Sequence, residues 1–240
     1  MNRYKEIFKR GIIVSCQAYE GEPMYTEDHS TMWRMAVAAQ MGGAVGIRAN
    51  YLDLDSIHEH CNLPLLAINK VHYADCVAEY TSTMKDVDEV CSLPYVKCIA
   101  MEVNDITRHT GELPLPEFIK EVKRKYPHIA IYADCSTYDE AVRAAEWGCD
   151  AVSSTDYGYY EGHRHRSLPA IQMVEDLVKA MEPYDIPVVA EGGINSEQHV
   201  KQLIESGAYN VVVGGAITRP QEQAARFCKW FDYHINRQVC

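Results

Sequence analysis

The chain has 240 residues, of which 47% are hydrophobic and 24% are charged, as in an ordinary globular protein. This composition excludes intrinsic disorder, a collagen-like chain and a long coiled coil. Because 23 Lys and Arg residues stand against 34 Asp and Glu residues, a formal charge of −11, we expect no binding to nucleic acid or to an anionic membrane surface. A small anionic substrate remains open, since a few local cations can hold a phosphate.

The first residues and the cysteines bear on the cellular location. Residues 1–10 predict a short amphipathic helix, and the apolar stretch 11–14 ends at Ser15, too early for a signal peptide or a membrane span. The nine cysteines form no C-x-x-C pair, and several lie inside apolar runs as small buried side chains do. We therefore expect a cytoplasmic protein with reduced thiols.

Eight short apolar runs alternate along the chain with segments of helical periodicity. The runs are residues 11–14, 44–47, 65–68, 96–100, 129–132, 151–152, 188–190 and 211–213, and the predicted helices include 30–41, 84–91, 115–126, 138–147, 168–181, 196–206 and 221–235. Continuous apolar strands followed by helices are typical of a parallel sheet covered by helices, and eight repeats in about 250 residues are typical of a TIM barrel. With no linker-like segment, we predict an α/β fold, a single (β/α)8 TIM barrel over residues 1–240 with a short N-terminal helix.

Local signals at the helix ends support this assignment. Thr137 is a predicted N-cap, Asn195 or Ser196 is another, and Gly148 and Gly207 stand where helices should end. The alternative fold is an open doubly wound sheet, but no G-x-G-x-x-G follows the first run.

Polar residues follow the apolar runs, and in a parallel barrel these positions meet at one mouth. Any one of them could be an ordinary loop charge, but together they indicate proton-transfer chemistry on a polar substrate. In chain order they are Gln17, Arg48, Lys70, Glu102, Asp134, Thr155, Glu191 and the pair Gly214-Gly215.

Two glycine pairs indicate a phosphate site. Gly192-Gly193 follows the seventh run, Gly214-Gly215 follows the eighth, and Arg219 comes shortly afterwards. Glycine lets backbone N–H groups approach a ligand closely, and the loops after strands 7 and 8 of such barrels often bind phosphate.

Lys70 and Glu191 are the candidate catalytic pair. A desolvated lysine at a barrel mouth can act as a base or as an imine-forming nucleophile. Glu191 would face it from the other side, so the two could remove a proton from one face of a carbon acid and return it to the other.

Other reactive residues carry weaker signals. His58-x-His60 and His163-x-His165 have spacings close to those of metal ligands, but each lies in a charged stretch without an evident third ligand, so we predict no metal site. Cys16 and Cys135 have no neighbouring His, which leaves nucleophilic catalysis a minor option.

Several segments together resemble the N-acetylmannosamine-6-phosphate 2-epimerase family, whose members are barrels of the ribulose-phosphate-binding type. The resemblance covers nearly the whole chain. It lies in SCQA at 15–18, GEP at 21–23, GGAVGIRAN at 42–50, Lys70, ADCST at 133–137, AEGGIN at 190–195 and VVVGGAITRPQ at 211–221.

The resemblance implies an isomerase of amino-sugar and sialic acid catabolism that acts by proton transfer at C2 of N-acetylmannosamine 6-phosphate and N-acetylglucosamine 6-phosphate. It implies no cofactor and no obligatory metal, and it leaves a homodimer open. Matched by position, Lys70 and Glu191 are catalytic; the residues that hold the sugar are Gln17, Arg48 and Asp134; those at the phosphate are Gly192, Gly193, Gly214, Gly215 and Arg219.

Two loops depart from the family pattern. The family usually has Asp-Ala-Thr after the fourth strand, where this chain has Glu102-Val103-Asn104, and residues 154–160 differ from the usual loop after the sixth strand. These differences bear on substrate preference and turnover. They also leave open a non-catalytic sugar-phosphate binder. Independently of these loops, Lys70 leaves open a lyase or aldolase that forms an imine with its substrate.

Overall fold

A closed barrel of eight parallel strands forms the centre of the protein. The computed structural model describes residues 2–104, 109–160, 164 and 166–238, with side chains as far as residue 231. Each strand pairs with the next in the chain, and the last pairs with the first. The strands are β1 (Gly11–Cys16), β2 (Gly46–Asn50), β3 (Leu65–Ile68), β4 (Cys98–Glu102), β5 (Ala130–Asp134), β6 (Ala151–Ser153), β7 (Val188–Glu191) and β8 (Asn210–Val213). The predicted TIM barrel is confirmed, and the open sheet is wrong because β1 pairs with β8.

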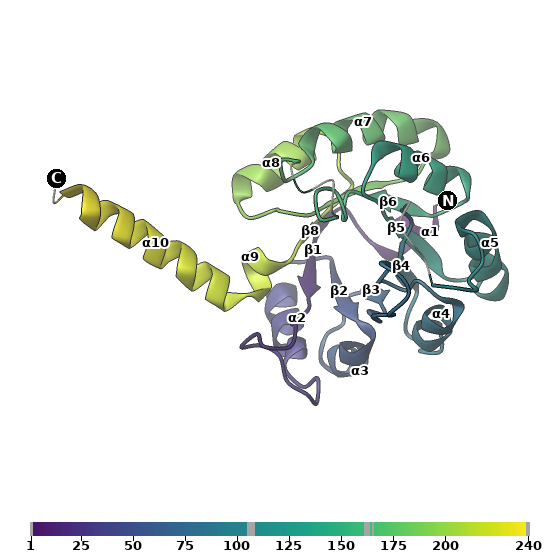
Figure 1. Ribbon diagram of the computed structural model, residues 1–240, viewed down its shortest axis with the longest axis horizontal. Coiled ribbons are helices and arrows are strands. Elements are labelled where there is room, and N and C mark those ends of the chain that lie inside the picture. Colours follow the sequence, from purple (N-terminus) through teal and green to yellow (C-terminus); the bar gives the residue numbers. More distant parts are fainter. Residues whose placement is uncertain (1, 105–108, 161–163, 165, 239–240) are drawn as a thin grey trace.

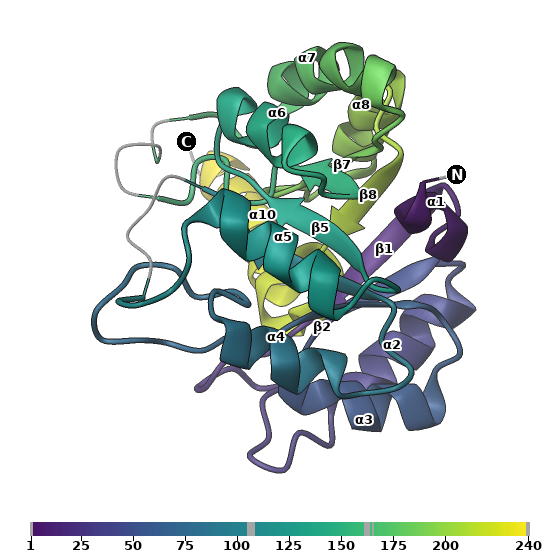
Figure 2. The ribbon, with the colours of Figure 1, turned by 90° about the vertical axis from the view of Figure 1, so that its right-hand side faces the viewer.

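Helices surround this barrel, as Figure 1 and the turned view of Figure 2 show. They are α1 (Arg3–Ile7), α2 (Met32–Met41), α3 (Tyr51–His60), α4 (Met84–Cys91), α5 (Leu115–Lys125), α6 (Tyr138–Glu146), α7 (Ile171–Met181), the 3₁₀ turn η1 (Glu182–Tyr184), α8 (Glu197–Glu205), α9 (Gly215–Thr218) and α10 (Pro220–Gln238). The sequence did not predict α3, because charged and polar residues interrupt its apolar face; even one of its buried residues, Asp53, is acidic.

The predicted helix ends are confirmed. The Thr137 hydroxyl accepts from the backbone of Glu140, whose side chain caps Thr137 in return, so α6 begins with a capping box. Ser196 caps α8 by accepting from His199 N. Gly148 and Gly207 lie just beyond α6 and α8 with φ of 96° and 95°, a region that favours glycine.

Six of the eight strands end later than their apolar runs predict, so four predicted site residues lie within strands rather than after them. Arg48, Glu102 and Asp134 are buried within β2, β4 and β5, and Glu191 is the last residue of β7. Charged residues can occupy the top of a barrel interior when they pair with one another, as the site below shows.

The short helix α1 closes the bottom of the barrel. Tyr4 and Phe8 are fully buried in the inner core, and the Tyr4 hydroxyl lies 3.1 Å from Asn210 Oδ1 on β8. Gly46 allows this packing, because a Cβ there would lie 2.7 Å from Phe8 Cε1. The predicted N-terminal helix thus belongs to the core.

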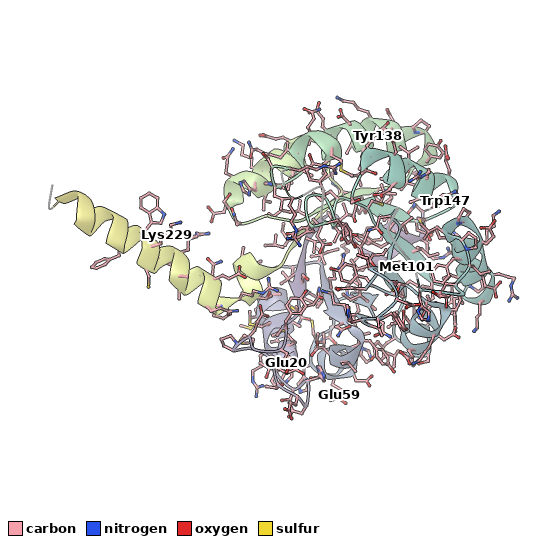
Figure 3. The ribbon with its side chains drawn as sticks, in the orientation of Figure 1. Glu20, Glu59, Met101, Tyr138, Trp147 and Lys229 are labelled. Carbon is pink, nitrogen blue, oxygen red and sulfur yellow. The ribbon has the colours of Figure 1, made fainter. Side chains whose placement is uncertain are left out.

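The last helix, α10, projects from the barrel (Figure 1). Side chains around Lys229 stand clear of the other elements in Figure 3. Phe227, Trp230 and Phe231 are 70%, 60% and 67% exposed, an apolar stripe at helical spacing. Across the described residues, no helix combines the length and apolar character needed to cross a membrane.

Candidate active site

A cavity of about 480 Å³ opens at the C-terminal ends of the strands. Every predicted site residue except Glu102 and Asp134 lines it. The residues in the lining are Gln17, Arg48, Lys70, Thr155, Glu191, Gly192, Gly193, Gly214, Gly215 and Arg219. The barrel topology has therefore brought together residues from the first, second, third, sixth, seventh and eighth strands or from the loops that follow them.

A buried ion cluster forms the floor of this cavity. Arg48, 2% exposed, donates from Nη1 to Asp134 Oδ1 at 2.8 Å and from Nη2 to Asp134 Oδ2 at 2.9 Å. The same Nη1 lies 2.7 Å from Glu191 Oε2. Asp134 is fully buried beneath Arg48, so it fixes the guanidinium and does not reach the cavity.

Glu191 is held by two hydroxyl groups as well. Tyr132 Oη donates to Glu191 Oε2 at 2.9 Å, and Thr155 Oγ1 donates to the same oxygen at 3.2 Å. Burial raises the pKa of Glu191 and nearby Asp134 raises it further, whereas Arg48 lowers it. Because every one of these contacts with the described residues uses Oε2, Oε1 is the atom left to face a ligand.

Lys70 lies between two tyrosine rings. Its Nζ is 2.6 Å from the Tyr19 hydroxyl, 4.4 Å from the centre of the Tyr19 ring and 4.5 Å from that of Tyr80. Its backbone N–H donates to Asn50 Oδ1 at 2.9 Å. Cation–π contacts and one hydrogen bond thus hold the amine at the cavity wall.

Two buried polar atoms in the cavity lining have no hydrogen-bond partner among the described residues. Gln17 Oε1 and Arg48 Nε are both buried without a hydrogen bond in the part of the chain that the structure describes. Gln17 Nε2 is occupied by the Ser15 hydroxyl at 2.7 Å. Buried polar atoms are rarely left unsatisfied, so these two indicate where a polar ligand binds.

The glycine pairs line the same cavity. Gly192 and Gly193 have φ of 104° and 65°, and the N–H of Gly193 donates to the Tyr159 hydroxyl at 3.2 Å. A Cβ on Gly193 would lie 2.3 Å from Leu168 Cβ, so only glycine fits. Gly215 begins α9.

Arg219 is already paired with two carboxylates. Its Nε lies 2.6 Å from Glu22 Oε1, and its Nη1 lies 3.5 Å from Glu222 Oε1. A Cβ on Gly215 would lie 2.7 Å from Glu222 Oε2, so this carboxylate lies against the glycine backbone. Two carboxylates therefore pair with the guanidinium group of Arg219 beside the glycine backbone.

Known proteins were compared with this chain. Residues 32–236 match the family model described as "Putative N-acetylmannosamine-6-phosphate epimerase". The chain belongs to this family. A protein of Clostridioides difficile (strain 630) named "Putative N-acetylmannosamine-6-phosphate 2-epimerase" is 41% identical over 222 residues, 92% of this chain and 96% of its own. One of Caldanaerobacter subterraneus with the same name is 39% identical over 220 residues, 91% and 90% of the two chains.

Solved structures give the same relationship. The N-acetylmannosamine-6-phosphate 2-epimerase from Clostridium perfringens superposes with a TM-score of 0.85 at 35% identity, over 94% of this chain and 95% of that one. Thiamine phosphate pyrophosphorylase from Pyrococcus furiosus, at 16% identity and a TM-score of 0.55 over 91% and 92% of the two chains, shares the fold.

The two loops that depart from the epimerase family pattern contact each other beside the cavity. The Tyr160 hydroxyl donates to Glu102, and Asn104 Nδ2 donates to Asp156 Oδ2 at 2.9 Å. Asp156 lines the cavity and is 3% exposed. Burial raises the pKa of Glu102 to about 7 and that of Asp156 well above its usual range. The residues that depart from the family pattern in the two loops thus form one hydrogen-bonded network.

Sequence reasoning missed the tyrosines of this epimerase-family site. Tyr132 precedes Asp134 by two residues and therefore lies on the same side of β5. Because side chains alternate between the two faces of a strand, this spacing could have predicted Tyr132 as a site residue. Tyr80 reaches Lys70 through an isolated antiparallel bridge in a loop, which no local pattern indicates.

The weaker candidates lie elsewhere. His58 and His60 are on α3, where their rings stack on Tyr95 and Trp33. His163 and His165 lie outside the described residues. Burial raises the pKa of the Cys16 thiol to about 12, so it stays protonated and unreactive at neutral pH.

Proposed function

We propose that this protein interconverts N-acetylmannosamine 6-phosphate and N-acetylglucosamine 6-phosphate by proton transfer at C2. One observation carries the proposal: a lysine and a glutamate line the same cavity, which two glycine loops suited to a phosphate also line. The names and similarity of the relatives support this substrate.

The chemistry needs two groups that exchange protons with one carbon. In the open-chain sugar the C1 carbonyl acidifies the C2 proton, so a base can remove it and leave an enolate-like intermediate. Return of a proton to the other face inverts C2. Lys70 and Glu191 are the two proton-transferring groups, since each reaches the cavity and each is held in place by neighbouring side chains.

The remaining residues bind and orient the sugar phosphate. Gln17 Oε1 and Arg48 Nε lack hydrogen-bond partners among the described residues. Gln17 Oε1 accepts a hydrogen bond from the sugar, and Arg48 Nε donates one to it. Asp134 contributes through Arg48, which it positions from below. The glycine pairs Gly192-Gly193 and Gly214-Gly215, together with Arg219, hold the phosphate.

Proton NMR in deuterated water tests this function. N-acetylmannosamine 6-phosphate incubated with the full chain should yield the gluco epimer with deuterium at C2. Lys70→Ala should lower turnover by about 10²–10⁴-fold with a modest loss of binding, because it removes a proton-transferring group. Lys85→Ala, an exposed lysine paired with Glu89, is the matched control and should leave turnover unchanged.

The same sample separates the two alternatives. Borohydride added with substrate would leave a covalent adduct on Lys70 if an imine formed, as in a lyase or aldolase. Binding seen by calorimetry without deuterium exchange would indicate a sugar-phosphate binder. Either result would refute epimerisation.

Two further statements belong with this proposal. We infer a homodimer from the exposed apolar stripe on α10, since a second copy of the chain would cover it. We also infer a cytoplasmic location, with no nucleic acid or membrane as partner. The absence of disulfide bonds among the eight described cysteines and the net charge of −11 support this inference.

A further inference from the structure

Three metal-ligating side chains meet at the rim of the barrel, outside the cavity lining. Asp75 and Cys76 lie in the connection from β3 to α4, and His109 lies in the connection from β4 to α5. One ligand atom from each side chain lies within 4.8 Å of the other two.

Contacts within this group already orient the ligands. His109 Nδ1 lies 2.6 Å from Asp75 Oδ1, and the N–H of Thr110 donates to Asp75 Oδ2 at 3.0 Å. The His109 ring packs against Tyr73 with ring centres 4.5 Å apart, and the Tyr73 hydroxyl donates to Asp86 Oδ1 at 2.7 Å. The imidazole is thus tied through Tyr73 to the first turn of α4.

The mixture of donors points to a transition metal. A thiolate, an imidazole and a carboxylate are the usual ligands of Zn²⁺, whereas Mg²⁺ and Ca²⁺ take oxygen alone. The His109 and Asp75 side chains are 35% and 39% exposed, which leaves room for a water ligand.

We propose that Asp75, Cys76 and His109 bind one divalent transition-metal cation of the zinc type, with water as the fourth ligand. Ligand atoms around tetrahedral zinc lie about 3.2–3.8 Å apart, so a separation of up to 4.8 Å requires a shift of about 1 Å in exposed loops. Cys76 gives its proton to solvent and exchanges its contact with Ala78 O, now at 3.3 Å, for the metal.

The bound ion would join the two loops at the mouth of the barrel. The β3–α4 connection also carries Lys70 and Tyr80. The site would therefore steady this wall of the cavity without taking part in proton transfer. It is independent of the proposed reaction, since its ligands do not line the cavity.

Cobalt and zinc titrations of the metal-free full chain test the site. Co²⁺ should produce the visible bands of a tetrahedral site and a near-ultraviolet thiolate-to-cobalt band, and calorimetry should find one equivalent of Zn²⁺. Cys76→Ser should abolish the thiolate band, and His109→Ala should weaken zinc binding at least tenfold.

Matched variants exclude binding at other surface groups. Cys228→Ser removes an exposed thiol far from the site in sequence, and His72→Ala removes an exposed imidazole from the same connection as Cys76. Both variants should bind metal as the unaltered chain does. Circular dichroism checks that every variant is folded. The absence of a thiolate band, or a band that survives Cys76→Ser in a folded protein, would refute the site.

Discussion

Arg219 is a cation held by carboxylates in the part of the cavity where a phosphate is expected. Glu22 and Glu222 neutralise it before a ligand arrives. A phosphate dianion offers more charge and more acceptor oxygens than either carboxylate, so it can replace Glu222 at the guanidinium. If Arg219 holds the phosphate as proposed, this arrangement should favour phosphorylated over neutral sugars.

Arg219→Ala should therefore act on binding. We expect KM to rise by about 10–100-fold while kcat changes little, because a charge-assisted hydrogen bond is worth about 1.5–3 kcal/mol and the phosphate lies away from C2. Steady-state kinetics measure both constants. Glu222→Gln should shift KM the other way, and Arg34→Ala, on the exposed face of α2, is the neutral control. A fall in kcat alone would show that Arg219 serves the chemistry instead.

Glu102 links pH to stability. Burial raises its pKa from about 4.5 to about 7, so the folded protein retains a proton that the unfolded chain releases. Stability therefore falls as pH rises from about 4.5 to about 7, by about 3 kcal/mol in total, and stays level above pH 7. Glu102→Gln has no proton to lose and should escape this decline.

Urea denaturation at pH 5 and pH 8 measures the effect. Between pH 5 and pH 8, the free energy of unfolding of Glu102→Gln should rise by about 3 kcal/mol relative to that of the unaltered chain. If the difference between the two proteins were the same at both pH values, Glu102 would have an ordinary pKa. Glu20→Gln, an exposed carboxyl of the loop after β1, supplies the background.

At the scale of elements, helix α6 depends on the residue that caps its N-terminus. Thr137 and Glu140 form a capping box that satisfies two backbone N–H groups. Thr137→Ala should lower the free energy of unfolding by about 1 kcal/mol, and Thr137→Ser should restore most of it. Urea midpoints measure both variants. Equal loss in both would mean that the Thr137 methyl group, rather than the cap, is what matters.

The elements show what local sequence can predict. Strands such as β3 follow from unbroken apolar runs, and α4 lies where its periodicity places it. Helix α3 was missed because it buries Asp53 among its apolar residues. Arg48 and Asp134 were placed after their strands because nothing local shows that two charges pair inside a barrel.

At the scale of the molecule, α10 carries apolar side chains that no other part of the described chain covers. Phe227→Glu combined with Trp230→Glu should convert a dimer into a monomer, because a charge on the exposed stripe cannot be buried without a partner. Light scattering should give about twice 27.2 kDa for the unaltered chain and about 27.2 kDa for the variant. Lys229→Glu, a charge change on the same helix, should remain dimeric. A single-chain mass for the unaltered protein would refute the dimer.

Topology explains why the site was easier to predict than its details. Strand order alone brings the ends of β2, β3 and β7 to one mouth, so Arg48, Lys70 and Glu191 could be grouped from sequence. Tyr80 and Glu222 reach the site through loop and helix geometry that has no sequence period.

The tyrosine at the centre of the barrel connects its two ends. Below, the Tyr132 ring lies 6.1 Å from that of Tyr4 in α1; above, its hydroxyl holds Glu191. The N-terminal helix therefore keeps water away from the lower side of the Glu191 carboxylate and preserves the burial that raises the pKa of Glu191. Removal of α1 would admit solvent from below and should lower the pKa of Glu191, although the two lie nearly two hundred positions apart in the chain.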